Sequence, residues 1–593
     1  MFLNRNEEFP IKQPCSVLLL GEGARETIKG GTGSGDVDCE YTTCEEGLEK
    51  AGFKITSKEF LNQNEYPFLK HNKEPKSDIA VYILARKSGQ SRDRTIDNGD
   101  VLLTANEIND ILYLNKKYKK FMLVLNVCGV VDLSPVKDVS NILLLSQLGV
   151  VTGDILGDII LGKQNPSGKL ATTWASLNDY KFINEFGKGD DINYKEGIFV
   201  GYRYFNSEGI KPLYPFGFGK SYTSFDISKI SLNNIKDEIK IKIKVKNIGN
   251  YSGKEVIQVY VSPSQENEVK PYQSLVAFKK TNELKPLKET EIELMFKLRD
   301  IARFDEKKAC YILDKGQYII RVGNSSENTN IYGFVELDED IITQQLKNIN
   351  VKELGFEEYK PIIILKDKLN DIQKIKLTKE DFDLIKVEYN YEYKMNKIIP
   401  NFKDEDLASL CIGDYSGICH IEMGVAGLTS TNVKEIKNYI KMADGPAGLR
   451  YNKRTNKFSG NPNKMTTAIP IETALAQTFN TELIEKYGNI IGKEMEIFDI
   501  HLWLAPAMNI HRNILCGRNF EYFSEDPLIT GKMAAAMVKS VQSYKNKGAT
   551  IKHFLANNQE TNRYNSNSKV SERTLREIYL KGFQIAIEES KPY

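Results

Sequence analysis

Side chains able to do acid, base and hydrogen-bonding chemistry concentrate in residues 501–563 of this chain. Two short apolar runs, 502–505 and 549–551, each lead directly into a polar loop. A strand followed by a polar loop and a helix is a βα unit, and barrels of such units carry their active sites on these loops. The loops contain Asn509, His511, Arg512, Arg518, Glu521, Glu525, Lys552, His553, Asn557, Asn558, Gln559 and Arg563.

The residue types on these loops suit a carbohydrate ligand. Sugar hydroxyls need both donors and acceptors; Arg and Lys donate, carboxylates accept, and His and Asn can do both. Solvated surface loops have a similar composition, so the residue types alone leave both interpretations open.

Three longer stretches resemble the barrel-domain signatures of glycoside hydrolase family 3, the β-glucosidase type. They are residues 443–450 (ADGPAGLR), 509–527 (NIHRNILCGRNFEYFSEDP) and 552–563 (KHFLANNQETNR), and they follow the family's order. The resemblance implies a retaining glycoside hydrolase that acts on O-glycosyl bonds of terminal β-linked glucose or a similar sugar.

The same resemblance implies a set of residues that hold the sugar. Asp444 matches the carboxylate that grips sugar hydroxyls in the family. The other predicted contacts of this subsite are Arg450, Arg518, Lys552 and His553, and Ser34 offers a hydroxyl from a glycine-rich turn.

Structural roles remain open for the same residues. Asp444 could stabilise the turn before Gly445, and Arg518 could pair with Glu521 or Glu525. Trp503 is expected in the core rather than against a sugar. Support from behind the site is expected of Asn558, Gln559 and Arg563.

The two carboxyl groups of a retaining glycosidase, about 5 Å apart, are hard to find in this sequence. The family's nucleophile is an aspartate beyond a Ser-Tyr-Asn stretch, and the sequence reaches Tyr593 without that stretch. The family's acid/base glutamate lies in a Ser-Gly-Glu-x-x-Asp-Arg context, whereas residues 88–94 read SGQSRDR. Gln90 cannot transfer the catalytic proton because it is an amide. Glu40 is the nearest alternative acid, so the catalytic residues stay unassigned.

Two hypotheses follow from these absences. In the first, the chain is most of a β-glucosidase whose barrel is truncated or completed by a separate polypeptide. In the second, the chain is a catalytically inactive, sugar-binding remnant.

The fold class is expected to be multidomain, α/β plus all-β, in four units. Residues 1–225 alternate predicted strands (16–20, 79–84, 121–127 and 142–145) with predicted helices (45–51 and 105–118), which indicates a mostly parallel sheet. Four further stretches, 30–37, 165–174, 194–205 and 214–225, resemble the α/β sandwich domain of family 3. That domain follows the barrel in commoner members but precedes it here.

The remaining units have different textures. Residues 226–337 contain runs of period two, such as 238–246, and resemble the fibronectin type III-like β-sandwich of the family. Residues 338–400 are expected to form a connector, with a helix over 378–387. Residues 401–593 are expected to form an incomplete (β/α)8 TIM-type barrel, since a complete one takes about 250 residues.

Two glycine-rich stretches invite nucleotide-binding interpretations that their spacing does not support. The Gly21-x-Gly23 pair has Glu26 where a dinucleotide motif needs its third glycine. Residues 30–37 (GGTGSGDV) lack the Lys-Ser/Thr pair of a phosphate-binding loop.

Composition narrows the class of protein and of partner. The 593 residues carry a net charge of +2, which argues against a nucleic acid or membrane partner. The partner that the resemblance implies is a small saccharide or an aryl or alkyl β-glycoside. No basic stretch and long apolar run open the sequence, so a cytoplasmic protein is expected. The eight cysteines fit reduced thiols. Neither Cys39 with Cys44 nor Cys411 with Cys419 and His420 has zinc spacing, so no metal and no cofactor are expected.

Overall fold

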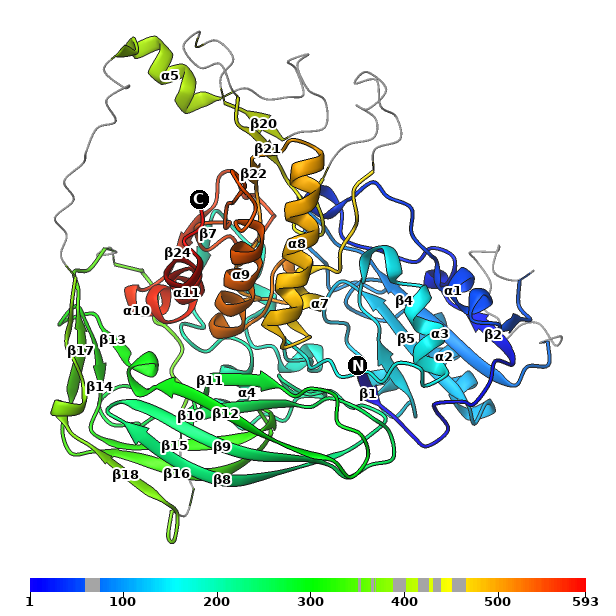
Figure 1. Ribbon diagram of the computed structural model, residues 1–593, viewed down its shortest axis with the longest axis horizontal. Helices are drawn as coiled ribbons and strands as arrows, with labels where there is room; N and C mark the ends of the chain where they lie inside the picture. The colour runs from blue at the N-terminus through cyan, green and yellow to red at the C-terminus, as the bar shows by residue number, and fades with distance from the viewer. Residues whose placement is uncertain are drawn as a thin grey trace.

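The structure, a computed structural model, describes residues 1–58, 75–349, 353–363, 367, 369–387, 401–413, 426–429, 433, 439–450 and 465–593. Figure 1 shows three packed parts: an α/β part, a set of β-sheets below it, and a group of helices and short strands from the last third of the chain. Cys419 and His420, which the sequence analysis considered as metal ligands, lie outside the described residues.

The α/β part is built on a six-stranded sheet in the order β1-β6-β5-β4-β2-β3. Neighbouring strands from β6 to β3 pair in parallel, and β1 is antiparallel to β6. The strands are β1 (Phe2–Asn4), β2 (Ser16–Leu20), β3 (Lys54–Ile55), β4 (Ile79–Arg86), β5 (Phe121–Val127) and β6 (Ile142–Leu144). Its helices are α1 (Cys44–Lys50), α2 (Ala105–Lys117), α3 (Asp154–Ile160) and α4 (Tyr202–Glu208). The predicted alternation of strands and helices is confirmed.

The β part consists of three sheets, ordered β11-β10-β15-β16-β18, β12-β9-β8 and β13-β14-β17-β19. Side chains along β9 alternate between buried and half-buried, because successive side chains of a strand point to opposite faces. The longer strands are β8 (Phe225–Ile235), β9 (Glu238–Asn247), β10 (Val256–Ser262), β11 (Ser274–Lys280), β12 (Glu289–Lys297), β15 (Gly316–Ser325) and β16 (Asn328–Leu337). The shorter ones are β13 (Arg303–Asp305), β14 (Cys310–Leu313), β17 (Ile341–Gln345), β18 (Lys374–Leu377) and β19 (Ile385–Lys386).

The helix predicted over residues 378–387 is wrong. The segment holds a single short turn at Lys379–Asp381 and then strand β19. Strand β18 pairs in parallel with β16, and β19 pairs in parallel with β17. This part of the connector therefore belongs to the sheets of the β part.

The last third of the chain contains a four-stranded sheet in the order β20-β21-β22-β23, of which β21, β22 and β23 are parallel. A closed barrel is not seen within the described residues, so the (β/α)8 barrel remains a prediction. The strands are β20 (Gly427–Leu428), β21 (Lys441–Ala443), β22 (Leu502–Trp503) and β23 (Gly548–Ala549). The helices are α5 (Asp404–Ile412), α7 (Glu472–Ala476), α8 (Thr481–Ile497), α9 (Pro527–Val541), α10 (Glu572–Thr574) and α11 (Lys581–Ser590).

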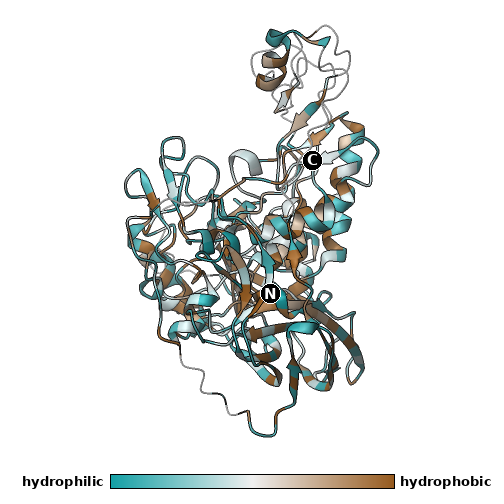
Figure 2. Ribbon diagram, turned by 90° about the vertical axis from the view of Figure 1, so that its left-hand side faces the viewer, coloured by the Kyte–Doolittle hydropathy of each residue, from teal (hydrophilic) through white to brown (hydrophobic). Residues whose placement is uncertain are grey.

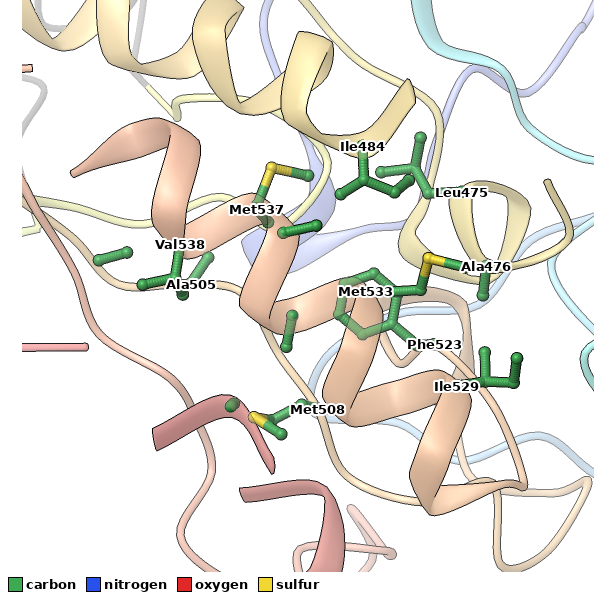
Figure 3. Packing of buried hydrophobic residues seen from close by; sticks show 14 of the residues in the cluster. Leu475, Ala476, Ile484, Ala505, Met508, Phe523, Ile529, Met533, Met537 and Val538 are labelled. Atoms are coloured by element: carbon green, nitrogen blue, oxygen red, sulfur yellow. The ribbon is translucent and has the colours of Figure 1, made fainter. Parts of the chain in front are cut away.

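Helix α9 is the centre of this part, and it is buried on nearly all sides. Figure 3 shows Met533 and Met537 of α9 among side chains that include Ile484 of α8, while Val538 lies beside Ala505 at the end of β22. Asp526 caps α9 by accepting hydrogen bonds from the backbone of Leu528 and Ile529, as the sequence predicted.

One strand crosses between parts of the chain that are far apart in sequence. Strand β24 (Asn567–Lys569) pairs in parallel with β7 (Asp191–Asn193) of the α/β part. By contrast, α5 stands away from the main body in both Figure 1 and Figure 2. Among the described helices, none combines the length and apolar character needed to cross a membrane.

Candidate active site

Asp444 and Lys552 form an ion pair at the carboxyl ends of the parallel strands. The Lys552 Nζ and Asp444 Oδ1 atoms are 2.5 Å apart. Asp444 directly follows β21, and Lys552 comes shortly after β23, so the parallel sheet brings both to one edge. Their side chains are 21% and 15% exposed, which leaves the pair within reach of a ligand.

Asp444 also serves the turn that follows it. Its Oδ1 atom accepts a hydrogen bond of 3.0 Å from the backbone N–H of Gly445. The backbone N–H of Arg450 returns to the carbonyl oxygen of Asp444 at 2.8 Å, and the Arg450 side chain is half-buried. The structural role considered for Asp444 and its position in the pair with Lys552 are therefore compatible.

His553 lies beside this pair and is held by Asn509. The Asn509 side chain accepts from the His553 backbone N–H at 2.9 Å and donates to the His553 carbonyl at 2.9 Å. Burial, together with the nearby cations Arg518, Lys552 and Arg563, lowers the pKa of His553 to about 2. The imidazole is therefore neutral at ordinary pH and can both donate and accept.

Arg518 is buried and enclosed by carboxylates. Its Nε atom donates to Glu521, the structural alternative that the sequence analysis considered, and its Nη1 atom lies 3.8 Å from Glu560 Oε1. Glu560 also accepts from Arg563 Nη1 at 2.5 Å and from the backbone N–H of Ser91 at 2.6 Å. Glu560 beside Arg518 thus receives hydrogen bonds from both the first and the last part of the chain.

Ser34 contacts Glu521 and Gln90. It is fully buried, and its hydroxyl donates to Glu521 Oε2 at 2.5 Å. The Gln90 Oε1 atom accepts from the backbone N–H of Ser34 at 3.1 Å. The hydrogen of this hydroxyl is engaged with Glu521, and the predicted contact of Ser34 with the sugar stays a prediction. Glu40, the alternative acid, is exposed.

Trp503, Asn558 and Gln559 form hydrogen bonds with neighbouring parts of the chain. Trp503 is fully buried, and its indole N–H donates to the Gly445 carbonyl at 3.0 Å. Asn558 is buried, donates to the Ile510 carbonyl and accepts from the Tyr194 hydroxyl. Gln559 accepts from the backbone N–H of Gly187.

Two carboxylates near the site escaped sequence reasoning. Glu472 is fully buried and accepts from the Ala507 backbone N–H, and burial together with Glu521 raises its pKa well above the usual range. Asp93 accepts from the backbone N–H groups of Gly517, Glu560 and Thr561. The position of Glu472 within the apolar run 468–476 could have indicated a buried carboxyl group. No local pattern indicates the partners of Asp93, because they lie more than 400 residues along the chain.

Comparison with known proteins assigns the chain to a family. Residues 415–592 match the glycosyl hydrolase family 3 N terminal domain, and residues 1–222 match the C-terminal domain of that family. Residues 255–326 match a fibronectin type III-like domain. The sequence is 33% identical to beta-glucosidase A of Butyrivibrio fibrisolvens, covering 100% of this chain and 83% of that protein. The chain belongs to glycoside hydrolase family 3.

Other family 3 members agree with this placement. A beta-glucosidase of Ruminococcus albus is 31% identical over 100% of this chain and 67% of its own length. The solved structure of a beta-glucosidase from Paenibacillus barengoltzii superposes with a TM-score of 0.83 at 28% identity, covering 100% of this chain and 71% of that one. In this family 3 chain the C-terminal-type domain comes first, as the permuted order predicted.

Proposed function

We propose that the Asp444–Lys552 pair is the glucose-holding subsite of a family 3 β-glucosidase. The substrates would be saccharides with a terminal β-linked glucose or a similar sugar, or aryl and alkyl β-glycosides. The observation that carries the proposal is the pair itself, which is partly exposed at the carboxyl ends of β21 and β23 beside a neutral His553.

The chemistry of these side chains matches adjacent sugar hydroxyls. The carboxylate of Asp444 accepts from two hydroxyls, while the Lys552 ammonium donates to one. Neutral His553 can donate from one ring nitrogen and accept at the other. Asn509 holds the His553 backbone through its N–H and its carbonyl. Arg450 and Arg518 belong to the proposal as further donors near the same sugar.

The chemical step proposed is hydrolysis with retention, which needs a nucleophile and an acid/base. We assign neither to a described residue. Glu521 and Glu560 are held by Arg518 and Arg563, and Glu472 is held by the Ala507 N–H. In this proposal the nucleophile comes from outside the described residues or from a separate polypeptide that completes the barrel.

Sugar binding without turnover is the second candidate function. Gln90 favours it, because an amide stands where the resemblance places the acid/base glutamate. Its oxygen is already engaged with the backbone of Ser34.

Domain limits and cellular location are part of the proposal. We propose an α/β sandwich domain over 1–225, a fibronectin type III-like domain over 226–337, a connector over 338–400 and a partial barrel over 401–593, in a cytoplasmic protein.

Titration of the purified chain with glucose by isothermal calorimetry, together with release of nitrophenol from an aryl β-glucoside, tests both candidates. Asp444→Asn is expected to weaken glucose binding at least tenfold, since it removes a charged acceptor and the partner of Lys552. Asp499→Asn is the matched control, because Asp499 forms a similar 2.6 Å pair with Lys441 at the opposite end of β21.

The outcomes separate the candidates. Glucose binding that Asp444→Asn weakens at least tenfold and Asp499→Asn does not, with nitrophenol release, supports the glucosidase. The same binding without release supports sugar binding alone. Binding that both variants weaken equally, or no binding by the parent chain, contradicts the assigned subsite.

A further inference from the structure

The glycine-rich loop of the α/β part, residues 30–37, lies flat against the loop that carries Arg518. A side-chain Cβ at Gly31 or at Gly35 would come within 2.3 Å of the Phe520 ring. Any larger residue at these two positions would lift the loop off the ring. The glycines therefore serve close contact between two parts of the chain, which explains a motif that fits no nucleotide-binding pattern.

Close contact at Phe520 brings Ser34 to the next residue, Glu521. The Ser34 hydroxyl donates to one carboxylate oxygen of Glu521, and the other oxygen receives Arg518 Nε. The exposed fractions of the Ser34 residue and the Glu521 side chain are both 0%, and that of the Arg518 side chain is 4%. Water therefore cannot replace a lost hydrogen bond among Ser34, Glu521 and Arg518 unless the structure changes.

The loop that carries Ser91 and Asp93 also contacts the surroundings of Arg518. The backbone N–H of Ser91 donates to Glu560, which lies near Arg518, and Asp93 receives the N–H of Gly517 directly before it. The α/β part thus contacts both carboxylates around Arg518 and the loop on which it stands.

We propose that Ser34 is a positioning residue for sugar binding, which acts through Glu521 to fix the guanidinium of Arg518. Ser34 itself does not touch the sugar. The part of this inference that concerns sugar affinity rests on the proposed function, whereas the part that concerns Arg518 does not.

Removal of the Ser34 hydroxyl leaves one buried oxygen of Glu521 without a donor. A carboxylate held on one side can turn, and the arginine that it orients then loses its fixed direction. Ser34→Ala is therefore expected to weaken glucose binding about tenfold, the effect of one hydrogen bond to a charged group.

The first measurement is independent of sugar. Phenylglyoxal modifies accessible guanidinium groups, and peptide mass spectrometry measures its reaction at Arg518 relative to exposed Arg92 in the full chain. Ser34→Ala is expected to raise the relative labelling of Arg518 several-fold. Ser57→Ala is the matched control, because Ser57 is equally buried in the α/β part and, among the described residues, bonds to the backbone of Leu19.

The second measurement is a double-mutant cycle on glucose affinity with Ser34→Ala and Glu521→Gln. If Ser34 acts through Glu521, the double variant binds glucose about as weakly as Glu521→Gln alone. Additive losses of glucose affinity would contradict the proposal that Ser34 acts through Glu521, because they mean that the two residues act separately.

The labelling result decides the inference even if glucose does not bind. Raised labelling of Arg518 in Ser34→Ala but not in Ser57→Ala supports the proposal that Ser34 positions Arg518. If the parent chain then does not bind glucose, only the proposed function is refuted. Unchanged labelling of Arg518 in Ser34→Ala, or an equal rise in Ser57→Ala, contradicts the positioning role of Ser34 whether or not glucose binds. The midpoint of thermal unfolding of each variant shows whether any equal rise comes from general loosening.

Discussion

Glu525 is a single buried carboxyl group that ties the last third of the chain to the α/β part. It accepts from the backbone N–H and hydroxyl of Thr173 at 2.8 and 2.7 Å and from the backbone N–H of Tyr202 at 2.8 Å. Burial raises its pKa from 4.5 to about 7, although these hydrogen bonds oppose the rise. The group is thus half-protonated near neutral pH.

Glu525 is expected to make the protein less stable as pH rises from 4.5 to 7. In that window the folded chain binds more protons at this group than the unfolded chain, so the free energy of unfolding falls with increasing pH. Glu525→Gln should flatten this dependence, at a cost of about 1–2 kcal/mol for one mismatched hydrogen bond. Urea unfolding at pH 5 and pH 7 measures both effects. An unchanged pH slope in the variant, relative to Glu588→Gln at an exposed position of α11, would contradict the assignment.

At this scale the sequence was informative about local roles and silent about distant partners. Asp526 was recognisable as a helix cap because its partners lie two and three residues away. Glu521, three residues from Arg518, was one of the two partners considered for it, the other being Glu525. The partner of Ser34 lies 487 residues away, so nothing in the local pattern distinguished an engaged hydroxyl from a free one.

Helices α9 and α11 cross at two glycines whose surroundings differ. A Cβ at Gly531 of α9 would lie 2.7 Å from Ile585 Cβ and 2.9 Å from the Gly582 carbonyl oxygen. A Cβ at Gly582 of α11 would meet its nearest atoms at 3.4 Å, an ordinary contact.

The two glycines are expected to respond oppositely to alanine. Gly531→Ala should lower the free energy of unfolding by about 1–3 kcal/mol, since the helices must separate. Gly582→Ala should leave it unchanged or raise it by up to about 1 kcal/mol through helix propensity. Urea unfolding of the two variants side by side measures the difference. Equal destabilisation would mean that the crossing tolerates no side chain on either helix.

Elements with a strong local pattern were predictable, and those created by neighbours were not. Strands β2 and β5 follow the predicted ranges because they are continuous apolar runs. The segment 378–387 was misassigned because β18 and β19 gain their hydrogen bonds from β16 and β17, which its own sequence does not reveal.

Lys280 lies where all three parts of the molecule meet. It belongs to β11, and its ammonium donates to the carbonyls of Ser167 in the α/β part and Thr478 between α7 and α8, both at 2.9 Å. Burial, together with a smaller effect of the nearby Lys169 and Lys254, lowers its pKa from 10.5 to about 7.

This junction is expected to make the whole molecule more stable as pH rises from 7 to 10.5. In that range the unfolded chain binds more protons at Lys280 than the folded chain, so the free energy of unfolding increases with pH. Lys280→Met should remove that contribution while it keeps most of the apolar packing. The measurement is the difference in unfolding free energy between pH 7 and pH 9, with Lys539→Met on the surface of α9 as control. A variant that keeps the parent's difference would contradict the prediction.

The pairing of β24 with β7 has a consequence for how the molecule is made. On the ribosome an N-terminal domain is complete before later residues emerge, and domains generally fold as units in that order. In this permuted chain β7, Thr173 and the glycine-rich loop are synthesised before the segments that dock on them. The loop that carries Arg518 and strand β24 therefore emerge when the α/β part on which they dock has already folded. In the commoner domain order the barrel would have to wait for its partner.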